Sequence, residues 1–385
     1  MNPKNTLVIN LKFLQTLAKF VDILSLFCYC FCKRLQRKAS GRRMARKKTS
    51  NEITIIDVAK EAGVSYSTVS RVVNNKSYVK PETREKVVQA MTRLGYQANL
   101  QARSLAGGRS NVIGLLVVDL TTQYVGEILR GIDDVLAASQ YELMLYTTHR
   151  RKTKESAYAN MMARGLADGL LVILPREPEA YVESLRQRNF PYVLIDQFGI
   201  DESDLSVTAA NHQGGYEATK HLIELGHRRI GIITGWMDMI SACHRLNGYK
   251  AALADYNISV DENLIFEGDF TQARGYFGTN LLLDLPIPPT AIFASNDVTA
   301  LGAIEAIRNR HLNVPEDISV IGFDDVPMAA ILSPQLTTVR QPLTEMGHLA
   351  TQLLLNRIHR PHEFQSSIIL PTELIIRDST APLKL

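Results

Sequence analysis

Hydrophobic positions follow one pattern before residue 110 and another after it. Between Thr54 and Leu105 apolar residues recur at helical spacing, and Gly63 and Gly95 stand where short helices would end. After Ser110, short runs rich in β-branched residues alternate with segments of helix length. The runs are apolar nearly throughout, as in parallel strands that are covered on both faces. The pattern predicts a small all-α head followed by a doubly wound α/β body.

Three helices are expected in the head. Thr54 and Asp57 have the spacing of a capping box before the first helix, and Ser65 is the expected N-cap of a second helix that runs through Val73. Pro81 suits the first position of a third helix. Two short helices joined by a tight turn and followed by a third are typical of a helix-turn-helix unit. The buried stripe of the third helix is expected to consist of Val87, Val88, Met91 and Leu94.

The body is expected to alternate strands with helices. Strands are expected at Val112–Val118, Glu142–Tyr146, Gly169–Leu174, Tyr192–Asp196, Ile230–Thr234, Ala291–Ala294 and Ser319–Phe323. Helices between them include Val125–Ala138, Gly215–Leu225, Gly248–Tyr256 and Thr299–Asn309. Because helices separate the strands too often for one small sheet, the pattern predicts a body of two similar lobes.

The second head helix is expected to present a polar outer face. Ala59 is small enough for a close helix crossing, and Val64 and Val69 fill the angle between the first two helices. Side chains with hydroxyl and guanidinium groups suit contact with base edges and phosphates in a major groove. A helical hairpin in a larger α domain is the alternative, but it explains neither the polar face nor the basic flanks. The residues left for the outward face are Ser65, Tyr66, Ser67, Ser70 and Arg71.

Charge is distributed unevenly along the chain. The formal net charge is +4, but residues 1–110 hold 21 Lys and Arg against 6 Asp and Glu, whereas the remaining 275 residues hold 22 against 33. A basic N-terminal part and an acidic remainder indicate that the N-terminal part binds a polyanion. A basic tail that only promotes solubility is the alternative, so charge by itself leaves nucleic-acid binding open.

The first 43 residues are expected to form an extension outside the folded domains. The apolar stretch 20–32 is too short to span a bilayer as a helix, and a signal-peptide pattern is not clear. Sequence upstream of a true start at Met44 is the favoured interpretation, and a membrane tether is the alternative. Three of the four cysteines lie in this extension and the fourth is Cys243. This is not a disulfide framework, so a reducing cytoplasm is expected.

The head segment from Ile55 to Val73 resembles the lac repressor/gal repressor (LacI/GalR) family of bacterial transcription factors. The resemblance extends over nearly all of residues 53–376. It implies that Tyr66, Ser67 and Arg71 read bases in the major groove. It also implies contacts with the DNA backbone at Asn74, Ser77 and Thr83. Lys80 stands where the family usually has a serine helix cap.

Residues 99–106 match the hinge helix of this family, which implies further DNA contacts at Asn99, Ala102 and Leu105. So short a helix is marginal in water, and it is expected to form when it pairs with its two-fold mate on DNA. The resemblance implies that Leu105 wedges into the minor groove and kinks the duplex. A buried leucine in a linker is the alternative. The two-fold arrangement implies a homodimer on a palindromic operator.

The expected domains follow from the head, the hinge and the body. They are the extension 1–43, a helix-turn-helix DNA-binding domain 44–97, a hinge helix and linker 98–110, and an effector-binding and dimerisation domain 111–385. Within the body, lobe 1 is expected at about 111–210 and 342–369, and lobe 2 at about 211–340 and 370–385. The chain is expected to cross between the lobes near Asn211, Gln341 and Leu370.

In the family, the body is similar to periplasmic sugar-binding proteins, with a ligand between two lobes. Ligands in such folds bind outside the carboxyl ends of the strands. Carboxylates and arginine suit vicinal hydroxyls, and an aromatic ring suits the apolar face of a sugar. Asp297 as a helix cap and Asp325 as a structural residue are alternatives, and Ala210 replaces an aromatic residue of some members. The expected effector-binding residues are Asp119, Tyr124, Asp196, Arg245, Phe270, Asn296 and Asp324.

An enzyme and an extracytoplasmic solute-binding protein are the alternatives to a transcription regulator. An enzyme would need a catalytic constellation, and the sequence has neither a nucleophile elbow, nor a zinc-protease helix, nor a Walker loop. An extracytoplasmic solute-binding protein would share the body but not the head. We therefore expect a cytoplasmic regulator and not an enzyme, with neither cofactor, nor metal, nor membrane partner. The expected function is a repressor that binds a palindromic operator as a dimer and responds to a mono- or oligosaccharide.

Overall fold

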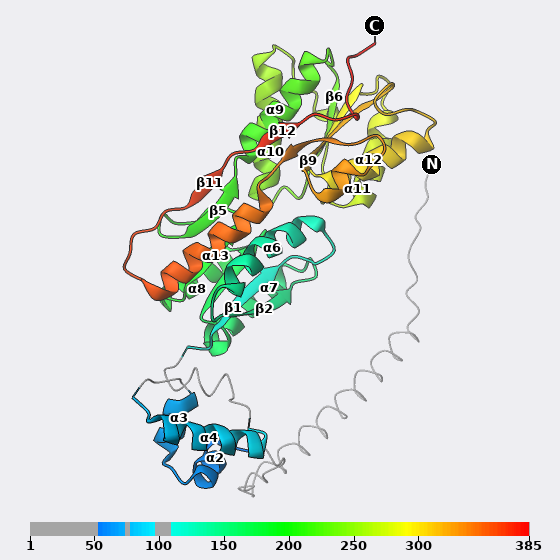
Figure 1. Cartoon of the computed structure of the whole chain (residues 1–385). Coiled ribbons are helices and arrows are strands. Elements are labelled where there is room, and N and C mark those ends of the chain that lie inside the picture. The colour runs from blue at the N-terminus through cyan, green and yellow to red at the C-terminus, as the bar shows by residue number, and fades with distance from the viewer. Residues whose placement is uncertain (1–52, 74–77, 97–108, 385) are drawn as a thin grey trace, which may run out of the picture. The chain divides into compact units, whose positions relative to one another are not determined.

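The computed structural model describes residues 53–73, 78–96 and 109–384. They form two compact units, a head that reaches Tyr96 and a body that follows it (Figure 1). Within these ranges no helix combines the length and apolar character needed to cross a membrane. The extension 1–43 and five expected contact residues lie outside the described residues; the five are Asn74, Ser77, Asn99, Ala102 and Leu105.

The head consists of helices α2 (Ile55–Ala62), α3 (Tyr66–Val73) and α4 (Pro81–Leu94). The carboxylate of Asp57 accepts a hydrogen bond from the Thr54 amide at 2.8 Å, and the hydroxyl of Ser65 accepts one from the Thr68 amide at 3.2 Å. Both predicted N-terminal caps are therefore confirmed. Gly63 ends α2 with a φ of 65°, a left-handed backbone that glycine adopts without a steric penalty.

The core of the head differs from the prediction in α4, where Met91 and Leu94 of the predicted stripe are half-buried. Val58, Val69 and Val87 are fully buried, and Ala90 joins them from α4. The prediction that Val88 is buried was wrong, because its side chain is 49% exposed. Successive residues are about 100° apart around a helix, so burial of Val87 turns its neighbour towards solvent, whereas Ala90 returns to the buried face three positions later.

The body holds two six-stranded sheets, and the part of the body around each sheet is called a lobe here. In lobe 1 the strands lie in the order β11-β5-β4-β3-β1-β2 and are all parallel. Their bounds are β1 Val112–Val117, β2 Glu142–Thr147, β3 Gly169–Ile173, β4 Tyr192–Ile195, β5 Leu205–Ala209 and β11 Ile368–Leu370.

In lobe 2 the order is β12-β10-β9-β8-β6-β7, and only β12 among these strands pairs in the antiparallel sense. Both sheets confirm the predicted two-lobed α/β fold. The strands are β6 Ile230–Ile233, β7 Ile265–Phe266, β8 Ala291–Ala294, β9 Ser319–Asp324, β10 Thr337–Arg340 and β12 Glu373–Ile375.

Helices cover both faces of each sheet (Figure 1). In lobe 1, Ile113 and Leu115 of β1 pack towards α6 and α13, whereas Val112 and Leu116 pack towards α7 and α8. The lobe 1 helices are α6 Gln123–Ala137, α7 Thr153–Met161, η1 Met162–Leu166, α8 Glu179–Gln187 and α13 Leu343–His359. Those of lobe 2 are α9 Asn211–Glu224, α10 Ile240–Asp255, η2 Glu262–Leu264, α11 Gln272–Leu283, α12 Asp297–Asn309 and η3 Pro327–Ala330.

Several element boundaries differ from the predictions. Strand β2 is partly exposed, because it lies at the edge of its sheet, so it is not covered on both faces as predicted. Helix α10 begins at Ile240, eight residues before the predicted start at Gly248. The prediction missed its first two turns because polar residues interrupt the apolar pattern there. Strand β5 escaped prediction because serine and threonine interrupt its apolar run.

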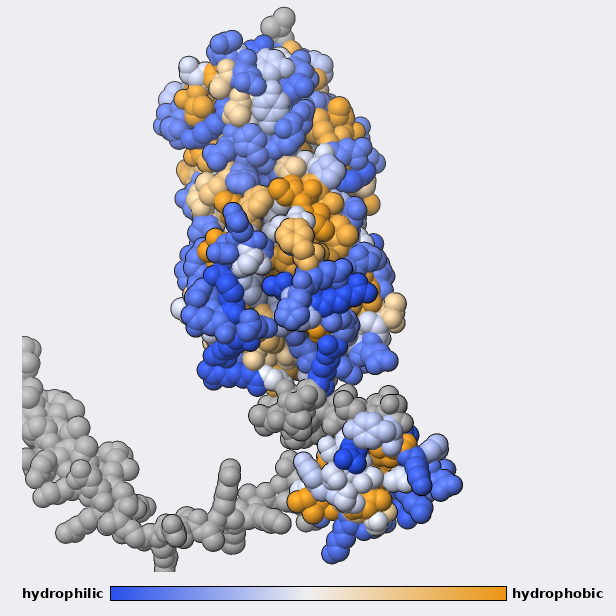
Figure 2. Space-filling view, turned by 90° about the vertical axis from the view of Figure 1, so that its left-hand side faces the viewer, coloured by the Kyte–Doolittle hydropathy of each residue, from blue (hydrophilic) through white to orange (hydrophobic). Residues whose placement is uncertain are grey.

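The chain passes between the two sheets three times. It leaves β5 for α9 at Ala210, leaves β10 for α13 at Gln341 and Pro342, and leaves β11 for β12 at residues 371–372. The two lobes are thus joined by three short crossings. On the face shown in Figure 2, hydrophilic residues predominate at both ends of the body, and hydrophobic residues gather near its middle.

Candidate effector pocket and DNA-binding surface

Helix α3 presents a polar face to solvent. Ser65, at its N-terminus, is exposed, as are Tyr66, Ser67 and Arg71, and the Tyr66 side chain is 53% exposed. The guanidinium of Arg71 lies 5.5 Å from the centre of the Tyr78 ring, a cation–π distance. Four of the five residues predicted for the outward face are therefore open to a partner.

Two predicted contact residues in the head are half-buried. Ser70 lies one position from the buried Val69 on α3, and Thr83 lies in the first turn of α4. Their side chains therefore offer less surface than the exposed residues of α3.

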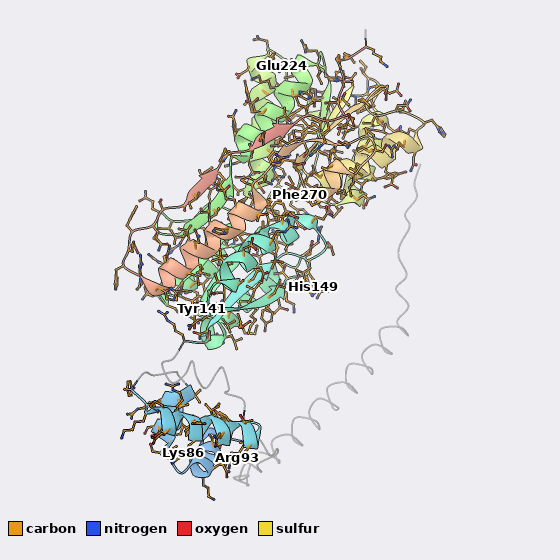
Figure 3. The ribbon with its side chains drawn as sticks, viewed as in Figure 1. Lys86, Arg93, Tyr141, His149, Glu224 and Phe270 are labelled. Atoms are coloured by element: carbon orange, nitrogen blue, oxygen red, sulfur yellow. The ribbon has the colours of Figure 1, made fainter. Side chains whose placement is uncertain are left out.

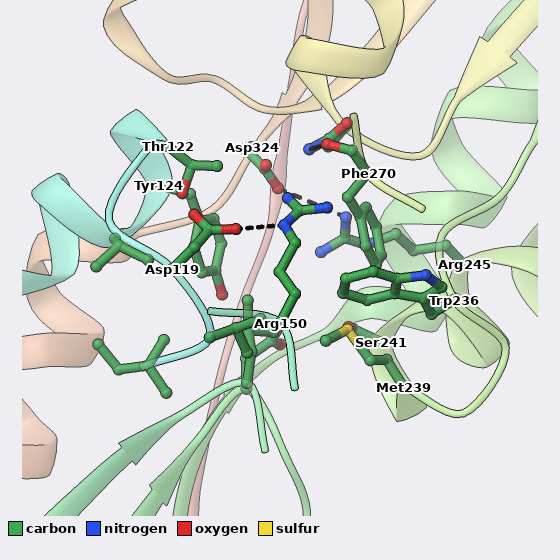
Figure 4. Close-up of a pocket in the computed structure, with 16 residues that line it drawn as sticks. Asp119, Thr122, Tyr124, Arg150, Trp236, Met239, Ser241, Arg245, Phe270 and Asp324 are labelled. Atoms are coloured by element: carbon green, nitrogen blue, oxygen red, sulfur yellow. Dashed lines mark hydrogen bonds and ion pairs between the residues drawn. The ribbon is translucent and has the colours of Figure 1, made fainter. Parts of the chain in front are cut away.

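All seven predicted effector residues line one cavity between the lobes (Figure 4). Phe270 lies where the two lobes meet (Figure 3). The cavity measures about 50 Å³, which is room for a few water molecules at roughly 10–15 Å³ each. The further lining residues are Val118, Thr122, Val125, Arg150, Ile173, Leu174, Trp236, Met239 and Ser241.

Arg245 is held rigidly at this cavity by neighbours from three elements. Its Nε donates to Oδ1 of Asn211 at 2.7 Å, and its Nη1 donates to the carbonyl of Ser295. The guanidinium stacks 3.8 Å from the centre of the Phe323 ring and lies 3.5 Å from the carboxylate of Asp324. Arg245 is 2% exposed, so its charge acts where water screens little.

Two buried carboxyl groups face Arg245. Burial raises the pKa of Asp324 to about 7, although Arg245 and a 2.7 Å hydrogen bond from Gln341 oppose the rise. Burial likewise raises the pKa of Asp196, against the attraction of Arg245 and a 3.0 Å hydrogen bond from Asn211. The group of one guanidinium and two carboxyls can thus change its protonation near neutral pH.

Three buried polar atoms around the cavity make no hydrogen bond of normal geometry among the described residues, although the two hydroxyls among them lie close enough to the carboxyl that carries the third to lower its pKa. They are the Tyr124 hydroxyl, Oδ2 of Asp196 and the Ser241 hydroxyl. A buried polar group without a partner costs free energy, so such groups are rarely left in a folded protein unless something binds them. These three polar groups can therefore accept further hydrogen bonds from within the cavity.

A second charged pair lies on the other side of the cavity. Nε of Arg150 donates to Oδ2 of Asp119 at 2.6 Å, and the guanidinium lies 5.0 Å from the centre of the Trp236 ring. Burial opposes ionisation of Asp119, but hydrogen bonds from Arg150 and Thr121 hold its pKa below the ordinary value. Trp236 and Phe270 supply two aromatic faces to the cavity (Figure 4).

Three residues that line the cavity were not predicted from the sequence: Arg150, Trp236 and Ser241. Arg150 follows β2 by three residues, and Trp236 follows β6 by three residues. The rule that ligands lie beyond the carboxyl ends of parallel strands points to these two loops, but it does not distinguish either residue from its neighbours in the loop. Ser241 lies in the first turn of α10, whose start was predicted eight residues too late.

Left-handed backbone turns bring several of these side chains into the cavity. Non-glycine residues with positive φ include Arg150 (62°), Asp196 (57°), Phe270 (64°) and Asp324 (110°), all of which line the cavity. Such conformations are strained for residues with a Cβ and often occur at functional sites. The strained residues indicate that the backbone beyond these strands is shaped to direct side chains into the cavity.

Three polar residues at or beside the cavity make structural contacts. Asn296 caps α12 by accepting the Thr299 amide at 2.9 Å. Asp297 is buried and accepts from the Val326 amide at 2.9 Å and the Thr338 hydroxyl at 2.5 Å. Asp325 pairs with two arginines outside the cavity. The helix cap is therefore Asn296, and the alternative interpretation of Asp297 as the cap was wrong.

Models of known protein families match both the head and the body of this chain. A model described as "Bacterial regulatory proteins, lacI family" matches residues 54–99, and one described as "Periplasmic binding protein-like domain" matches residues 219–380. Catabolite control protein A of Priestia megaterium is 36% identical over 329 residues, which cover 85% of this chain and 99% of that protein.

Two solved structures are similar along the whole of their own length. The lac repressor dimer bound to operator and the anti-inducer ONPF has a TM-score of 0.73 and 30% identity, covering 86% of this chain and 100% of that one. The transcriptional regulator CelR in complex with cellobiose has a TM-score of 0.65 and 32% identity, covering 85% and 99%. The chain therefore belongs to the lacI family of bacterial regulatory proteins and is a DNA-binding transcription regulator, not an enzyme.

Proposed function

We propose that this regulator represses transcription from a palindromic operator, which it binds as a homodimer, and that a sugar in the cavity between the lobes controls the binding. The observation that carries the effector is the cavity between the lobes, where the polar groups of Tyr124, Asp196 and Ser241 lack hydrogen bonds of normal geometry and the aromatic side chains of Trp236 and Phe270 form part of the lining. Sugar hydroxyls would satisfy those atoms, and the rings of Trp236 and Phe270 would cover the apolar C–H groups. Cellobiose in the similar CelR structure supports this class.

The DNA-binding part of the proposal rests on the exposed face of α3. Tyr66, Ser67 and Arg71 present a phenol, a hydroxyl and a guanidinium side by side, which are groups that hydrogen-bond to base edges. The operator-bound lac repressor dimer supports a dimer on a two-fold operator. A regulator of this kind acts where the chromosome is, in the cytoplasm.

The domain assignment is part of the same proposal. Residues 44–97 would hold the DNA-binding unit, 98–110 the hinge and linker, and 111–385 the effector-binding and dimerisation unit. Because the cavity has room for only a few water molecules, the lobes would have to part to admit a sugar. A sugar that binds the open and closed forms unequally would shift the population between two arrangements of the dimer and so change operator affinity. Coupling of this kind is typically worth about 1–3 kcal/mol, or roughly 5–150-fold in affinity.

Selection of duplexes from a random pool by the full chain tests the DNA part. We expect enrichment of an inverted repeat and, for Arg71→Ala, a loss of preference at one base pair of each half-site, worth about 1–3 kcal/mol. Arg93→Ala is the control, because Arg93 lies on α4 and pairs with Glu61. A pool that yields no inverted repeat would reject a palindromic operator.

Calorimetric titration with ribose, cellobiose and a panel of other mono- and disaccharides tests the effector part. We expect one sugar to bind, and Ser241→Ala to weaken its affinity about 3–10-fold, because one hydrogen bond is lost. Ser203→Ala is the control, because this exposed serine does not line the cavity. If no sugar binds, or if both variants bind like wild type, the sugar assignment is wrong.

A further inference from the structure

A cluster of charged and aromatic residues joins the two lobes beside the cavity. Arg176 follows β3 in lobe 1, and Asp238 follows β6 in lobe 2. Nη2 of Arg176 donates to Oδ2 of Asp238 at 2.7 Å, and its Nε donates to Oδ1 at 3.4 Å. The guanidinium thus forms hydrogen bonds with both carboxylate oxygens. Paired hydrogen bonds of this type have a defined geometry and are stronger than single ion pairs.

Two further contacts reinforce the pair. The guanidinium of Arg176 stacks 3.8 Å from the centre of the Trp236 ring, which also belongs to lobe 2. The ammonium of Lys152, from lobe 1, pairs with the same carboxylate of Asp238 and lies 3.2 Å from Glu177. Hydrogen bonds from Lys152 and Arg176 hold the pKa of Asp238 below its ordinary value although burial opposes this. Asp238 therefore stays ionised at neutral pH.

The loop that carries Arg176 is itself fixed in place. The buried carboxylate of Glu155, on α7, accepts hydrogen bonds from the backbone amides of Arg176 at 3.1 Å and Glu177 at 3.2 Å. Arg176 is 11% exposed and Asp238 is 31% exposed, so solvent screens this pair less than a surface pair. The contact is thus preorganised from the lobe 1 side.

The three covalent crossings between the lobes follow β5, β10 and β11, whereas this cluster links the loops after β2, β3 and β6. Separation of the lobes at these loops must therefore break the contacts of Arg176 and Lys152. We propose that Arg176 and Lys152 of lobe 1 form a latch with Trp236 and Asp238 of lobe 2, which holds the cleft closed and sets how often it opens. The latch shares Trp236 with the lining of the cavity, but it consists of contacts within the protein, so it acts whether or not the sugar assignment is correct.

Hydrogen–deuterium exchange of the full chain, measured by mass spectrometry with no sugar added, tests the latch. The reporter segments are 118–122 in lobe 1 and 294–298 in lobe 2, which line the cavity and lie outside the latch. We expect Arg176→Gln and Asp238→Asn each to speed exchange in both segments, roughly five- to thirty-fold, as the loss of a partly buried pair with cation–π stacking predicts. The matched control is Arg360→Gln, which removes the 3.2 Å pair with Glu363 and no contact between the lobes.

A double variant separates the latch from two independent local effects. If Arg176 and Asp238 act through each other, the variant with both changes exchanges more slowly than the two single effects combined would predict, because both single changes remove the same ion pair, and only the contacts with Lys152 and Trp236 are lost separately. Wild-type exchange in both reporter segments, with changes confined to the loops at 174–178 and 236–240, would overturn the proposal. Additive effects of the two changes would also overturn it. Sugar titration of wild type is a separate measurement, so failure of the proposed effector would leave this test intact.

Discussion

Nη1 of Arg245 lies 3.5 Å from Oδ1 of Asp324, and their side chains are 3% and 5% exposed. Both residues belong to lobe 2, where α10 supplies the guanidinium and the end of β9 supplies the carboxyl. The pair is therefore assembled within one lobe and faces the other across the cavity. A buried charge pair with supporting hydrogen bonds is costly to break by removal of one partner.

Removal of Arg245 tests this dependence. We expect Arg245→Gln to lower the free energy of unfolding by about 3–5 kcal/mol at pH 8, because Asp324 and Asp196 are left buried beside no cation. The loss is expected to be smaller at pH 5, where the carboxyls can take up protons. Urea denaturation at the two pH values measures both quantities. An equal loss at both would show that packing, and not charge, accounts for the effect.

The raised pKa of Asp324 predicts a pH dependence of stability with a definite sign. An unfolded aspartate has a pKa of about 3.9, whereas burial raises that of folded Asp324 to about 7, so the folded protein binds the extra proton between these values. The contribution of Asp324 to stability is thus fully present below about pH 4 and is lost as the pH rises through about 7. The difference is of the order of 1–4 kcal/mol, since one pKa unit equals about 1.4 kcal/mol.

Asp324→Asn provides the comparison for this pH dependence. The amide cannot ionise, so the stability of wild type relative to the variant is expected to fall between pH 4 and pH 7 and then to level off. Chemical denaturation of both proteins at pH 4.5, 6, 7 and 8 measures the difference. Parallel curves over this range would rule out titration of Asp324 near neutrality.

Two glycines on α6 make a matched pair for the packing of α6 on α13. A Cβ added at Gly131 would lie 1.8 Å from the carbonyl oxygen of Thr344, whereas one added at Gly126 would meet no atom within 4 Å. We expect Gly131→Ala to destabilise lobe 1 by about 3 kcal/mol or more, because two helix backbones must move apart. Gly126→Ala is expected to be neutral or to stabilise by up to about 1 kcal/mol through higher helix propensity. Thermal unfolding of the two variants checks the contrast, which similar melting temperatures would contradict.

The N-cap of α3 predicts a local effect in the head. Ser65→Ala removes the acceptor of the 3.2 Å hydrogen bond from the Thr68 amide, and we expect a loss of about 1 kcal/mol in helix stability. Hydrogen exchange over residues 66–73 of the full chain measures it as a rate increase of roughly fivefold. Lys86→Ala is the control because Lys86 is exposed on α4 and takes no part in the cap. If the two variants exchange alike, Ser65 does not cap the helix.

Much of the candidate pocket could be predicted from the sequence, because ligands in parallel α/β folds bind beyond the carboxyl ends of the strands and those ends can be recognised from a few neighbouring residues. Asp119, Asp196 and Asp324 each come at or directly after a strand that is visible as an apolar run. All seven predicted residues line the cavity, although their contact with an effector stays a prediction. Arg150 and Trp236 obey the same rule at three residues' distance, where the sequence offers no reason to prefer them to their neighbours.

The amino-acid sequence alone determined the all-α head, the alternation of strands and helices in the body, the caps at Thr54 and Ser65, and the residue types at the strand ends, because each depends on neighbours within a few positions. Only the tertiary structure decided that Arg176 meets Asp238, 62 residues further along the chain. Periodicity reports which face of an element is apolar, whereas the pairing of two charges depends on how the two sheets are placed. Hydrophobic burial is non-directional, so a strand can be recognised from its apolar residues alone. An ion pair needs two particular atoms within about 4 Å of each other, and the packing of the whole body decides whether they meet.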